Sequence, residues 1–388
     1  MSSDLLNAFV AGIDALLPEA ASLRRAIHAD PHLGGDEGDT RDAITAAADW
    51  LDWTPVAETG AWARTGPDGP AVGLRAELDA LPITEATGVE WASGRRGIMH
   101  ACGHDVHMAA LWAVMTVARD LDLPVAMVPI LQPREELNPP GASDVVASGI
   151  LEDADVRAMV GVHVQPAVER GLVSTGAGAV NAAFDGFDIT ITGRGGHGAY
   201  PHAAVDPITV LASIVTALGG ITQRTVDPLN PAVVSVGLFQ GGTAPNIIAD
   251  TATCSGSIRT FQESDRSNIH DAITRLAEGT AIARGASATV QFTRGGPAVV
   301  NDPRLVAGAD ALLKGLGIPV ADVPFRSCGS DDFSEYGEIV PSLMSFIGTG
   351  TGDGVSLHSA KFLPGRGAMR LSAIALAANY LAAAETLR

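Results

Sequence analysis

Apolar residues in the first 180 positions recur in two alternating patterns. Some segments repeat them at helical spacing, and others are short continuous apolar runs. The helical segments cover 5–17, 20–29 and 108–121, and the apolar runs cover 71–78, 125–131 and 158–164. Buried apolar strands that alternate with helices are typical of a mostly parallel sheet with both faces covered. The sequence therefore predicts an α/β domain whose ligands bind outside the carboxyl ends of the strands.

The pattern changes near residue 184. Phe187, Ile189 and Ile191 alternate with polar residues, which predicts a strand with one solvent-facing side. A helix is expected next, because Asp206 suits an N-cap and Pro207 suits the first helical position. Further strands are predicted at 232–239, 251–260 and 288–293, and a second helix at about 264–284. This β-α-β-β-α-β order is that of a ferredoxin-like unit.

The two patterns divide the chain into an interrupted domain and an insertion. An apolar strand at 342–347 and an Ala-rich terminal helix come after these strands and helices, so the α/β domain resumes in the last part of the chain. We predict that residues 1–183 and 293–388 form this domain, and that 184–292 form an inserted α+β domain. The length of 388 residues, at roughly 150 per domain, suits two or three such units.

Composition and charge narrow the classes of partner. The chain has 44 acidic and 25 basic residues, and its formal net charge of −19 repels nucleic acids and anionic membranes. The acidic start of the chain lacks the basic region of a signal peptide, and no uninterrupted run of about 18 apolar residues occurs. Three cysteines, Cys102, Cys254 and Cys328, are too few for a disulfide framework and suit a reducing compartment. We therefore expect a cytoplasmic protein that binds neither nucleic acid nor membrane.

The densest candidate chemistry lies in residues 99–107, MHACGHDVH, ahead of an apolar helix. Cys102 and His104 are two positions apart, so in an extended segment they would point to the same side, as two ligands of one metal centre must. Two other interpretations stay open. One is a buried structural cysteine with a capping histidine, and the other is a Cys102 nucleophile with a histidine base.

A pair of carboxylates adjoins the end of the apolar run 125–131. Glu135 and Glu136 are adjacent there, and neighbouring carboxylates repel one another. A buried pair at a strand end is explained if a cation holds one carboxylate and the other transfers protons. A solvated surface pair is the alternative.

Three further polar residues occupy places where a site could form. His163 closes the run 158–164, and His358 lies in a Gly-rich loop that could complete a site from a distance. Either could equally be an ordinary core or loop histidine. Asp79, at the end of a predicted strand, could orient a ligating histidine or simply begin a turn.

Nine segments, taken in order, resemble the M20 metallopeptidases, specifically the amidohydrolase branch with aminoacylase-like, hippurate hydrolase-like and indole-acetyl-amino-acid hydrolase-like enzymes. The resemblance runs nearly end to end. The segments are LRRAIH (23–28), RAELDALPITE (75–85), MHACGHDVH (99–107), QPREE (132–136), VGVHVQP (161–167), GRGGHGAYPH (193–202), GGTAPNIIAD (241–250), SDDF (330–333) and LHS (357–359). The chain departs from the family at residues 137–140, where LNPP replaces a glycine-rich run, and this puts the choice of substrate in doubt.

The resemblance implies a zinc-peptidase-like catalytic domain, with residues 184–292 as a lid and dimerisation domain. It also implies Glu135 as the general acid and base, Asp79 as a residue that orients a metal ligand, and His197 as a residue that reaches a neighbouring subunit's active site. Asn246 and Arg259 are its candidates for binding the substrate. The implied ligands of a two-metal centre are Cys102, His104, Glu136, His163 and His358.

The function implied is hydrolysis of the amide bond of N-acyl amino acids, or related small amides, by a homodimer. The alternatives are a dipeptidase or carboxypeptidase, an aromatic amine deaminase, a non-catalytic metal-binding protein, and a thiol hydrolase that would keep working in chelator. Thiolate and imidazole ligands favour zinc, whereas carboxylates and an open position also admit manganese, cobalt or nickel.

Overall fold

The computed structural model describes residues 2–350, 352 and 354–388, and its chain divides into two compact units. Unit 1 comprises Met1–Val180, Val300–Phe325 and Asp332–Arg388. Unit 2 comprises Asn181–Val299 and Arg326–Asp331. The return of 326–331 to unit 2 has no counterpart in the hydrophobic pattern. It is held there by the carbonyls of Ser327 and Gly329, which accept from the Ala182 N–H at 3.0 and 3.1 Å.

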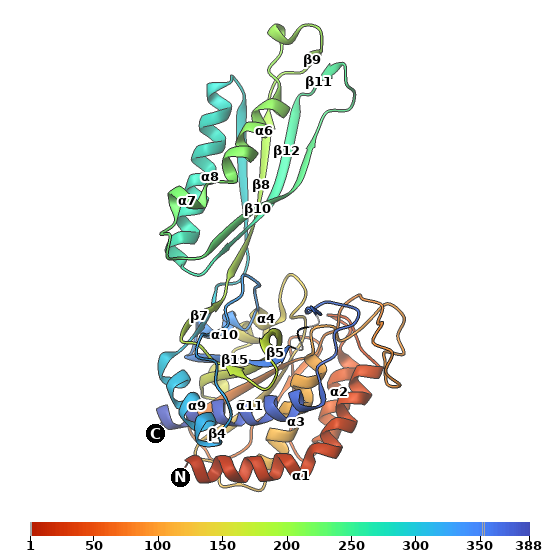
Figure 1. Ribbon diagram of the computed structural model, residues 1–388, viewed down its shortest axis with the longest axis vertical. Helices are drawn as coiled ribbons and strands as arrows, with labels where there is room; N and C mark the ends of the chain where they lie inside the picture. Colours follow the sequence, from red (N-terminus) through yellow and green to blue (C-terminus); the bar gives the residue numbers. More distant parts are fainter. Residues whose placement is uncertain (1, 351, 353) are drawn as a thin grey trace. The chain divides into compact units, whose positions relative to one another are not determined.

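A mixed sheet forms the centre of unit 1 (Figure 1). Its order among the described residues is β1-β2-β4-β3-β5-β15-β6, with β4, β3, β5 and β15 parallel to one another. All residues of β3 and β4 are buried, which explains why their sequences are nearly continuous apolar runs. The predicted α/β architecture is thereby confirmed. The strands are β1 (Thr54–Val56), β2 (Gly60–Trp62), β3 (Ala71–Glu77), β4 (Ala126–Gln132), β5 (Val156–Glu169), β6 (Val173–Ser174) and β15 (Ser342–Gly350).

Helices pack against this sheet, and the first of them differs from its prediction. The sequence predicted a break between 5–17 and 20–29, but α1 is continuous from Ser2 to Ala29 with Pro18 inside it. Its buried residues Phe9, Ile13 and Ala20 continue along one face on both sides of Pro18, so packing outweighs the helix-breaking tendency of proline. The other helices are α2 (Gly38–Ala47), α3 (His104–Ala118), α4 (Gly141–Ala147), α5 (Ile150–Asp153), α9 (Pro303–Gly315), α10 (Ser334–Gly337) and α11 (Arg366–Thr386).

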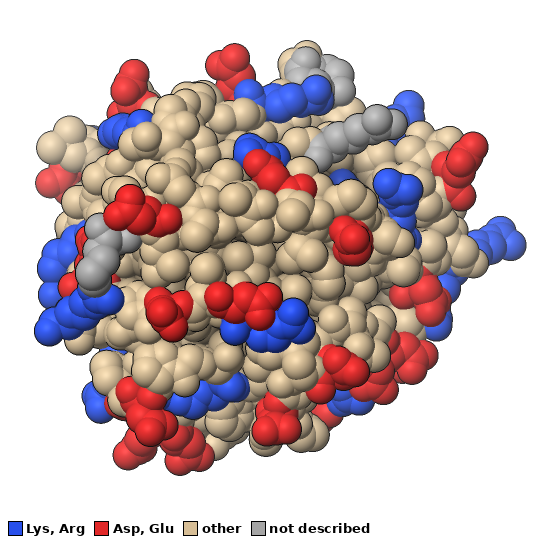
Figure 2. Space-filling view, turned by 90° about the horizontal axis from the view of Figure 1, so that it is seen from below, with Lys and Arg blue, Asp and Glu red and all other residues tan. Residues whose placement is uncertain are grey.

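Two helices, Ser2–Ala29 and Gly367–Thr386, are long and apolar enough to cross a membrane by length and composition alone. In the second helix, 83% of an 18-residue apolar stretch is buried inside the protein, as in the core helix of a globular domain. In the first, the side chains of Leu6, Phe9 and Ile13 belong to the same buried core as α3 and α11. On the face shown in Figure 2, the acidic and basic side chains are interspersed.

Unit 2 has the predicted β-α-β-β-α-β order. Its antiparallel sheet runs β10-β12-β8-β13, and Phe187, Ile189 and Ile191 on β8 point into a core beneath α6 and α8. The side chain of Asp206 caps α6 by accepting the Ile208 N–H at 2.9 Å, as the sequence indicated. The elements are β8 (Ala183–Thr192), α6 (Pro207–Leu218), α7 (Thr222–Thr225), β10 (Ala232–Gly241), β12 (Thr251–Thr260), α8 (Glu263–Ala283) and β13 (Ser287–Arg294). Short pieces complete the chain: β7 (Gly178–Asn181), β9 (Gly196–His197), η1 (Pro201–Ala203), β11 (Ile247–Ile248) and β14 (Val299–Asn301).

Candidate functional site

The polar residues singled out in unit 1 lie where the central strands β3 and β4 end. Asp79 follows β3, Glu135 and Glu136 follow β4, and His163 lies within β5, which extends further than predicted, to Glu169. Parallel strands bring their carboxyl ends to one edge of a sheet. The candidate carboxylates and His163 therefore lie along this edge of the sheet, and α3 begins beside it.

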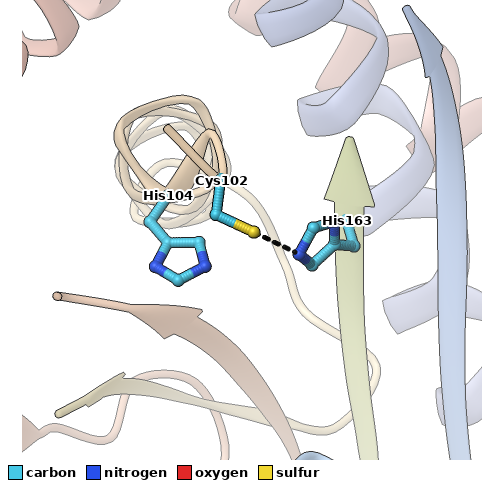
Figure 3. Close-up of side chains that lie close together, drawn as sticks. All are labelled: Cys102, His104 and His163. Atoms are coloured by element: carbon cyan, nitrogen blue, oxygen red, sulfur yellow. Dashed lines mark hydrogen bonds between the residues drawn. The ribbon is translucent and has the colours of Figure 1, made fainter. Parts of the chain in front are cut away.

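Cys102, His104 and His163 face one another in a buried cluster (Figure 3). Their ligand atoms all lie within 4.8 Å of one another, and the Cys102 Sγ is 3.5 Å from the His163 Nε2. The sequence analysis assumed that the segment around Cys102 is extended, but in the structure it is not. Gly103 turns the chain with a φ of +88°, where a Cβ would approach Val164 to 2.4 Å, and His104 opens α3. The turn, rather than strand geometry, brings the two side chains together.

A second group shares Cys102 with the first. The ligand atoms of Cys102, Glu136 and His358 also lie within 4.8 Å of one another, and the His358 Nε2 is 3.1 Å from the Glu136 Oε1. The loop that carries His358 is tied to the Cys102 segment, because the His358 N–H donates to the Ala101 carbonyl at 3.0 Å. The structure thus brings together the five residues that the sequence singled out as metal ligands.

His104 is oriented as a metal-binding histidine would be. Its Nδ1 donates to the Asp79 main-chain oxygen at 2.9 Å, while its Nε2 is buried without a hydrogen-bond partner among the described residues. Burial opposes a charge on His104, but Glu77 and Asp79 outweigh it and raise the pKa of His104 to about 10. The carboxylates around His104 therefore attract positive charge to this place, which a bound cation could supply. The donor set of thiol, imidazole and carboxylate fits a divalent cation.

The surroundings of Cys102 do not favour an activated thiol. Burial raises the pKa of the Cys102 thiol well above its usual range, and the carboxylates of Glu136 and Glu135 raise it further. A nucleophilic cysteine needs a lowered pKa, supplied by nearby positive charge. Cys102 therefore suits a metal ligand better than the nucleophile with a histidine base that the sequence left open.

Glu135 borders both ligand groups. Its Oε2 lies 4.0 Å from the His104 Nε2, and its carboxylate forms a third compact group with His104 and Glu136. The side chain is 10% exposed, so Glu135 is largely shielded from solvent. This position suits a carboxylate that exchanges a proton with a reactant at the site.

A neighbouring network was not identified from the sequence as part of the site. His107 lies near Glu77 and His104, but its Nδ1 faces the Glu77 Oε2 at 2.9 Å and its Nε2 accepts the Val164 N–H at 2.9 Å. Both ring nitrogens are thus engaged, so His107 is not available as a ligand and instead supports the strand beside His163. Arg75 pairs with Glu77 and contacts Asp332 at 2.7 Å. Charged residues within the apolar strand β3 are the sequence signal that could have revealed this network.

The three candidates in unit 2 fall into two places. His197 pairs with Ile247 across β9 and β11, and the Gly198 N–H donates to the Asn246 carbonyl at 2.8 Å, so His197 and Asn246 lie together. The His197 Nδ1 accepts the Ala199 N–H at 3.1 Å, which leaves the proton of the neutral ring on its Nε2.

Arg259 lies on β12 of the four-stranded sheet, whereas His197 lies in the separate two-stranded sheet of β9 and β11. Arg259 pairs with Phe184 at the start of β8, its guanidinium lies 4.3 Å from the Phe184 ring centre, and its Nη1 donates to the Ser330 Oγ at 3.2 Å. The eight steps of β8 from Phe184 to Thr192 separate it from the His197 end by roughly 26 Å. The structure therefore does not bring Arg259 together with His197 and Asn246 inside unit 2.

The chain is similar to known hydrolases and peptidases. The chain is 34% identical over 344 residues to an N-acetyl-L-cysteine deacetylase of Bacillus subtilis, covering 87% of this chain and 82% of that protein. It is 32% identical over 367 residues to thermostable carboxypeptidase 2 of Saccharolobus solfataricus, covering 91% and 92%. A crystal structure of a dinuclear metal-binding peptidase of the M20 family from Bacillus subtilis superposes with a TM-score of 0.86 at 29% identity, covering 96% and 99%.

The model of peptidase family M20/M25/M40 matches residues 73–384, which include β4, β5, most of β3 and all five candidate ligands. This match confirms the resemblance to the M20 family, and eight of the nine sequence segments lie within the matched residues. The chain belongs to peptidase family M20/M25/M40.

Proposed function

We propose that this protein is a metal-dependent amidohydrolase that cleaves the amide bond of N-acyl amino acids. The observation that carries the proposal is the sharing of Cys102 between two compact ligand groups, one with His104 and His163 and the other with Glu136 and His358. Glu135 stands beside both groups. The N-acetyl-L-cysteine deacetylase relative supports this class of substrate.

The two ligand groups would hold two divalent ions per chain. Five ligands are more than one tetrahedral site with an open position can use, and the dinuclear M20 structure supports the same number. We propose zinc, because a thiolate and imidazoles are among the ligands, with manganese, cobalt or nickel as substitutes. When bound, such a pair lowers the pKa of a water molecule and polarises a carbonyl group.

Glu135 is the proposed general base and acid. Its carboxylate would accept a proton from the attacking water and return that proton to the departing amine, so that the amide nitrogen leaves as a neutral group. Glu136 has a different task, because its oxygen faces His358 within the ligand group. Two adjacent carboxylates would thus serve two roles, ligation and proton transfer.

The unit 2 residues would bind the substrate and stabilise the transition state. The Nε2–H of His197 would donate to the oxygen that gains negative charge, and Asn246 and Arg259 would bind polar groups of the substrate. The separation of Arg259 from His197 and Asn246 in one unit 2 is too large for one small substrate to bridge. We propose that unit 2 acts as a lid and forms a two-fold dimer. One chain could then supply Arg259 to a site to which its partner supplies His197 and Asn246, so that no single unit 2 has to span the distance.

A dipeptidase or carboxypeptidase activity is the second candidate, favoured by the likeness to thermostable carboxypeptidase 2. Deamination of an aromatic amine would use the same water attack, but no feature described above selects for it. We also propose a reducing, cytoplasmic location. Cys102, Cys254 and Cys328 are all free thiols, and Cys328 is exposed.

A substrate screen tests the proposal. The protein is loaded separately with each of the four metals and assayed with N-acetyl amino acids, their methyl esters at the carboxyl group, and dipeptides. We expect hydrolysis of the N-acetyl amino acids, with a lower kcat/KM for the esters because they lack the anionic carboxylate. Cleavage of dipeptides alone would favour the peptidase alternative. Equal kcat/KM for the N-acetyl amino acids and their methyl esters would exclude a site that binds the substrate's carboxylate.

A further inference from the structure

Glu135 lies in the loop that joins β4 to α4, and its two neighbours in this loop are held by buried carboxylates. The Glu136 N–H donates to the Asp79 Oδ2 at 2.9 Å. On the other side of Glu135, the Arg134 N–H donates to the Glu37 Oε1 at 2.8 Å. Glu37 is fully buried and belongs to neither ligand group described above.

The backbone at Arg134 needs this support. Arg134 has a φ of +54°, in the left-handed region that residues with a Cβ rarely adopt. Such conformations persist only where the surroundings fix them. The Glu37 carboxylate meets the N–H of this same residue, and the Arg134 carbonyl accepts the Gly141 N–H at 3.1 Å. The turn that sets the direction of Glu135 is therefore held at both of its peptide groups.

Glu37 is itself fixed in place. Its Oε2 accepts the Thr59 hydroxyl at 2.7 Å. The segment just before it lies against the same loop, because a Cβ on Gly34 would come within 2.7 Å of the Leu137 side chain and 3.5 Å of the Arg134 Cα. A side chain at position 34 would push against the loop, so glycine allows this close approach.

We propose that Glu37 is a positioning residue for catalysis, which holds Arg134 in its left-handed turn and so aims the Glu135 carboxylate at the reacting groups. This inference rests on the role proposed above for Glu135. Glu37 reaches the reactants only through the backbone of the loop. Glu136, held separately by Asp79, keeps its place as a ligand when Glu37 is changed.

The geometry separates the acceptor function of Glu37 from its charge. In Glu37→Gln the amide oxygen can still accept the Arg134 N–H, while the amide NH₂ can donate to the Thr59 hydroxyl. In Glu37→Asp the charge stays but the reach is one methylene shorter. In Glu37→Ala the acceptor is lost. Thr59→Val is the matched control, because it removes the other hydrogen bond of Glu37 and leaves the bond to Arg134.

The test measures kcat, KM, metal content and hydrogen exchange at Arg134 in the metal-loaded protein. We expect Glu37→Ala and Glu37→Asp to lower kcat by up to on the order of 100-fold, the size of effect of a misplaced catalytic group, with KM changed by less than about threefold. Metal content should match that of the wild type. Exchange of the Arg134 amide should be faster in both variants, and Glu37→Gln and Thr59→Val should stay within about fivefold of wild-type kcat.

Three results would overturn the inference. One is unchanged protection of the Arg134 amide in Glu37→Ala or Glu37→Asp, and another is lost protection with wild-type kcat. The third is a Glu37→Gln variant as impaired as Glu37→Asp, because this would make the charge decisive. If Glu37→Ala does not fold, Glu37→Asp against Glu37→Gln carries the same comparison. A wild-type protein that hydrolyses no amide refutes the proposed function instead, and the exchange data alone then decide whether Glu37 holds the loop.

Discussion

The Asp79 carboxylate accepts a hydrogen bond from the backbone N–H of Glu136 at 2.9 Å. The main-chain oxygen of the same Asp79 accepts the Nδ1–H of His104 at 2.9 Å. One residue at the end of β3 thus orients two candidate ligands from different segments, α3 and the loop after β4. Residues that orient ligands in this way affect metal affinity without touching the metal.

Replacing Asp79 should weaken metal binding. Asp79→Ala removes the acceptor of the Glu136 N–H, so we expect the affinity for the tighter ion to fall by about 10- to 100-fold. Competition with a chelator of known affinity measures this. Asp68→Asn is the control, because Asp68 is exposed on a bend of the same unit. Equal affinity in Asp79→Ala and the wild type would show that Asp79 does not orient the ligands.

The two adjacent glutamates should respond differently to the same substitution. Glu135→Gln keeps the shape of the side chain but cannot accept a proton, so turnover should fall by at least about 100-fold with metal content unchanged. Glu136→Gln removes an anionic ligand, so metal content should fall first. Elemental analysis alongside steady-state kinetics separates the two effects. An exchange of these behaviours between the variants would reverse the assigned roles.

Subunit complementation tests whether His197 acts on the partner's site. Glu135→Ala and His197→Ala chains, each expected to be inactive alone, are co-expressed so that the proposed dimers include mixed ones. If His197 serves the partner, each mixed dimer has one site with both lesions and one site with neither. Random mixing then gives about a quarter of wild-type activity. No recovery in purified mixed dimers would mean that His197 serves its own chain or has only a structural role.

Arg266 should be essential to the stability of unit 2. Its buried guanidinium pairs with the buried Asp185 carboxylate, and Asp185 also accepts the Gly295 N–H at 3.0 Å. Arg266→Met removes the main partner of the buried Asp185 carboxylate and leaves it with His270, whose Nε2 lies 2.7 Å away. We expect this loss to cost about 3 kcal/mol. The exposed pair Arg294–Glu263 supplies the control, since Arg294→Met should cost less than about 1 kcal/mol.

Hydrogen exchange of peptides from β8 and α8 is the suitable measurement for this prediction, because all five tryptophans lie in unit 1. Burial opposes the charge on Asp185, yet Arg266 and the Gly295 amide keep its pKa below the usual range. The contribution of the pair is therefore present above the pKa of an unfolded aspartate and is lost as the pH falls towards the folded pKa. Equal protection of unit 2 in the two variants would contradict this account.

Local signals in the sequence predicted much of the fold. The strand predicted at 251–260 is observed as Thr251–Thr260, and the predicted cap and proline begin α6. These features depend on neighbouring residues. The continuity of α1 through Pro18 depends instead on the surface that the helix packs against, which local propensity does not reveal.

The site was predictable where ligand types cluster or match family segments, as with Cys102 and His104. The supporting contacts were not, because their partners are distant in the sequence. Glu37 and Arg134 are 97 positions apart, and His107 and Val164 are 57 apart. A buried glutamate in a polar stretch looks like a surface residue until the fold shows which backbone group it meets.

The central claim is that two bound metal ions and Glu135 hydrolyse an amide. The most direct measurement titrates metal-free protein with zinc or manganese while following hydrolysis of an N-acetyl amino acid, with bound metal determined at each step. We predict that chelator abolishes activity and that full activity returns at two ions per chain, with Glu135→Gln binding two ions but remaining inactive. Activity that persists at trace metal content in the presence of chelator would contradict the account.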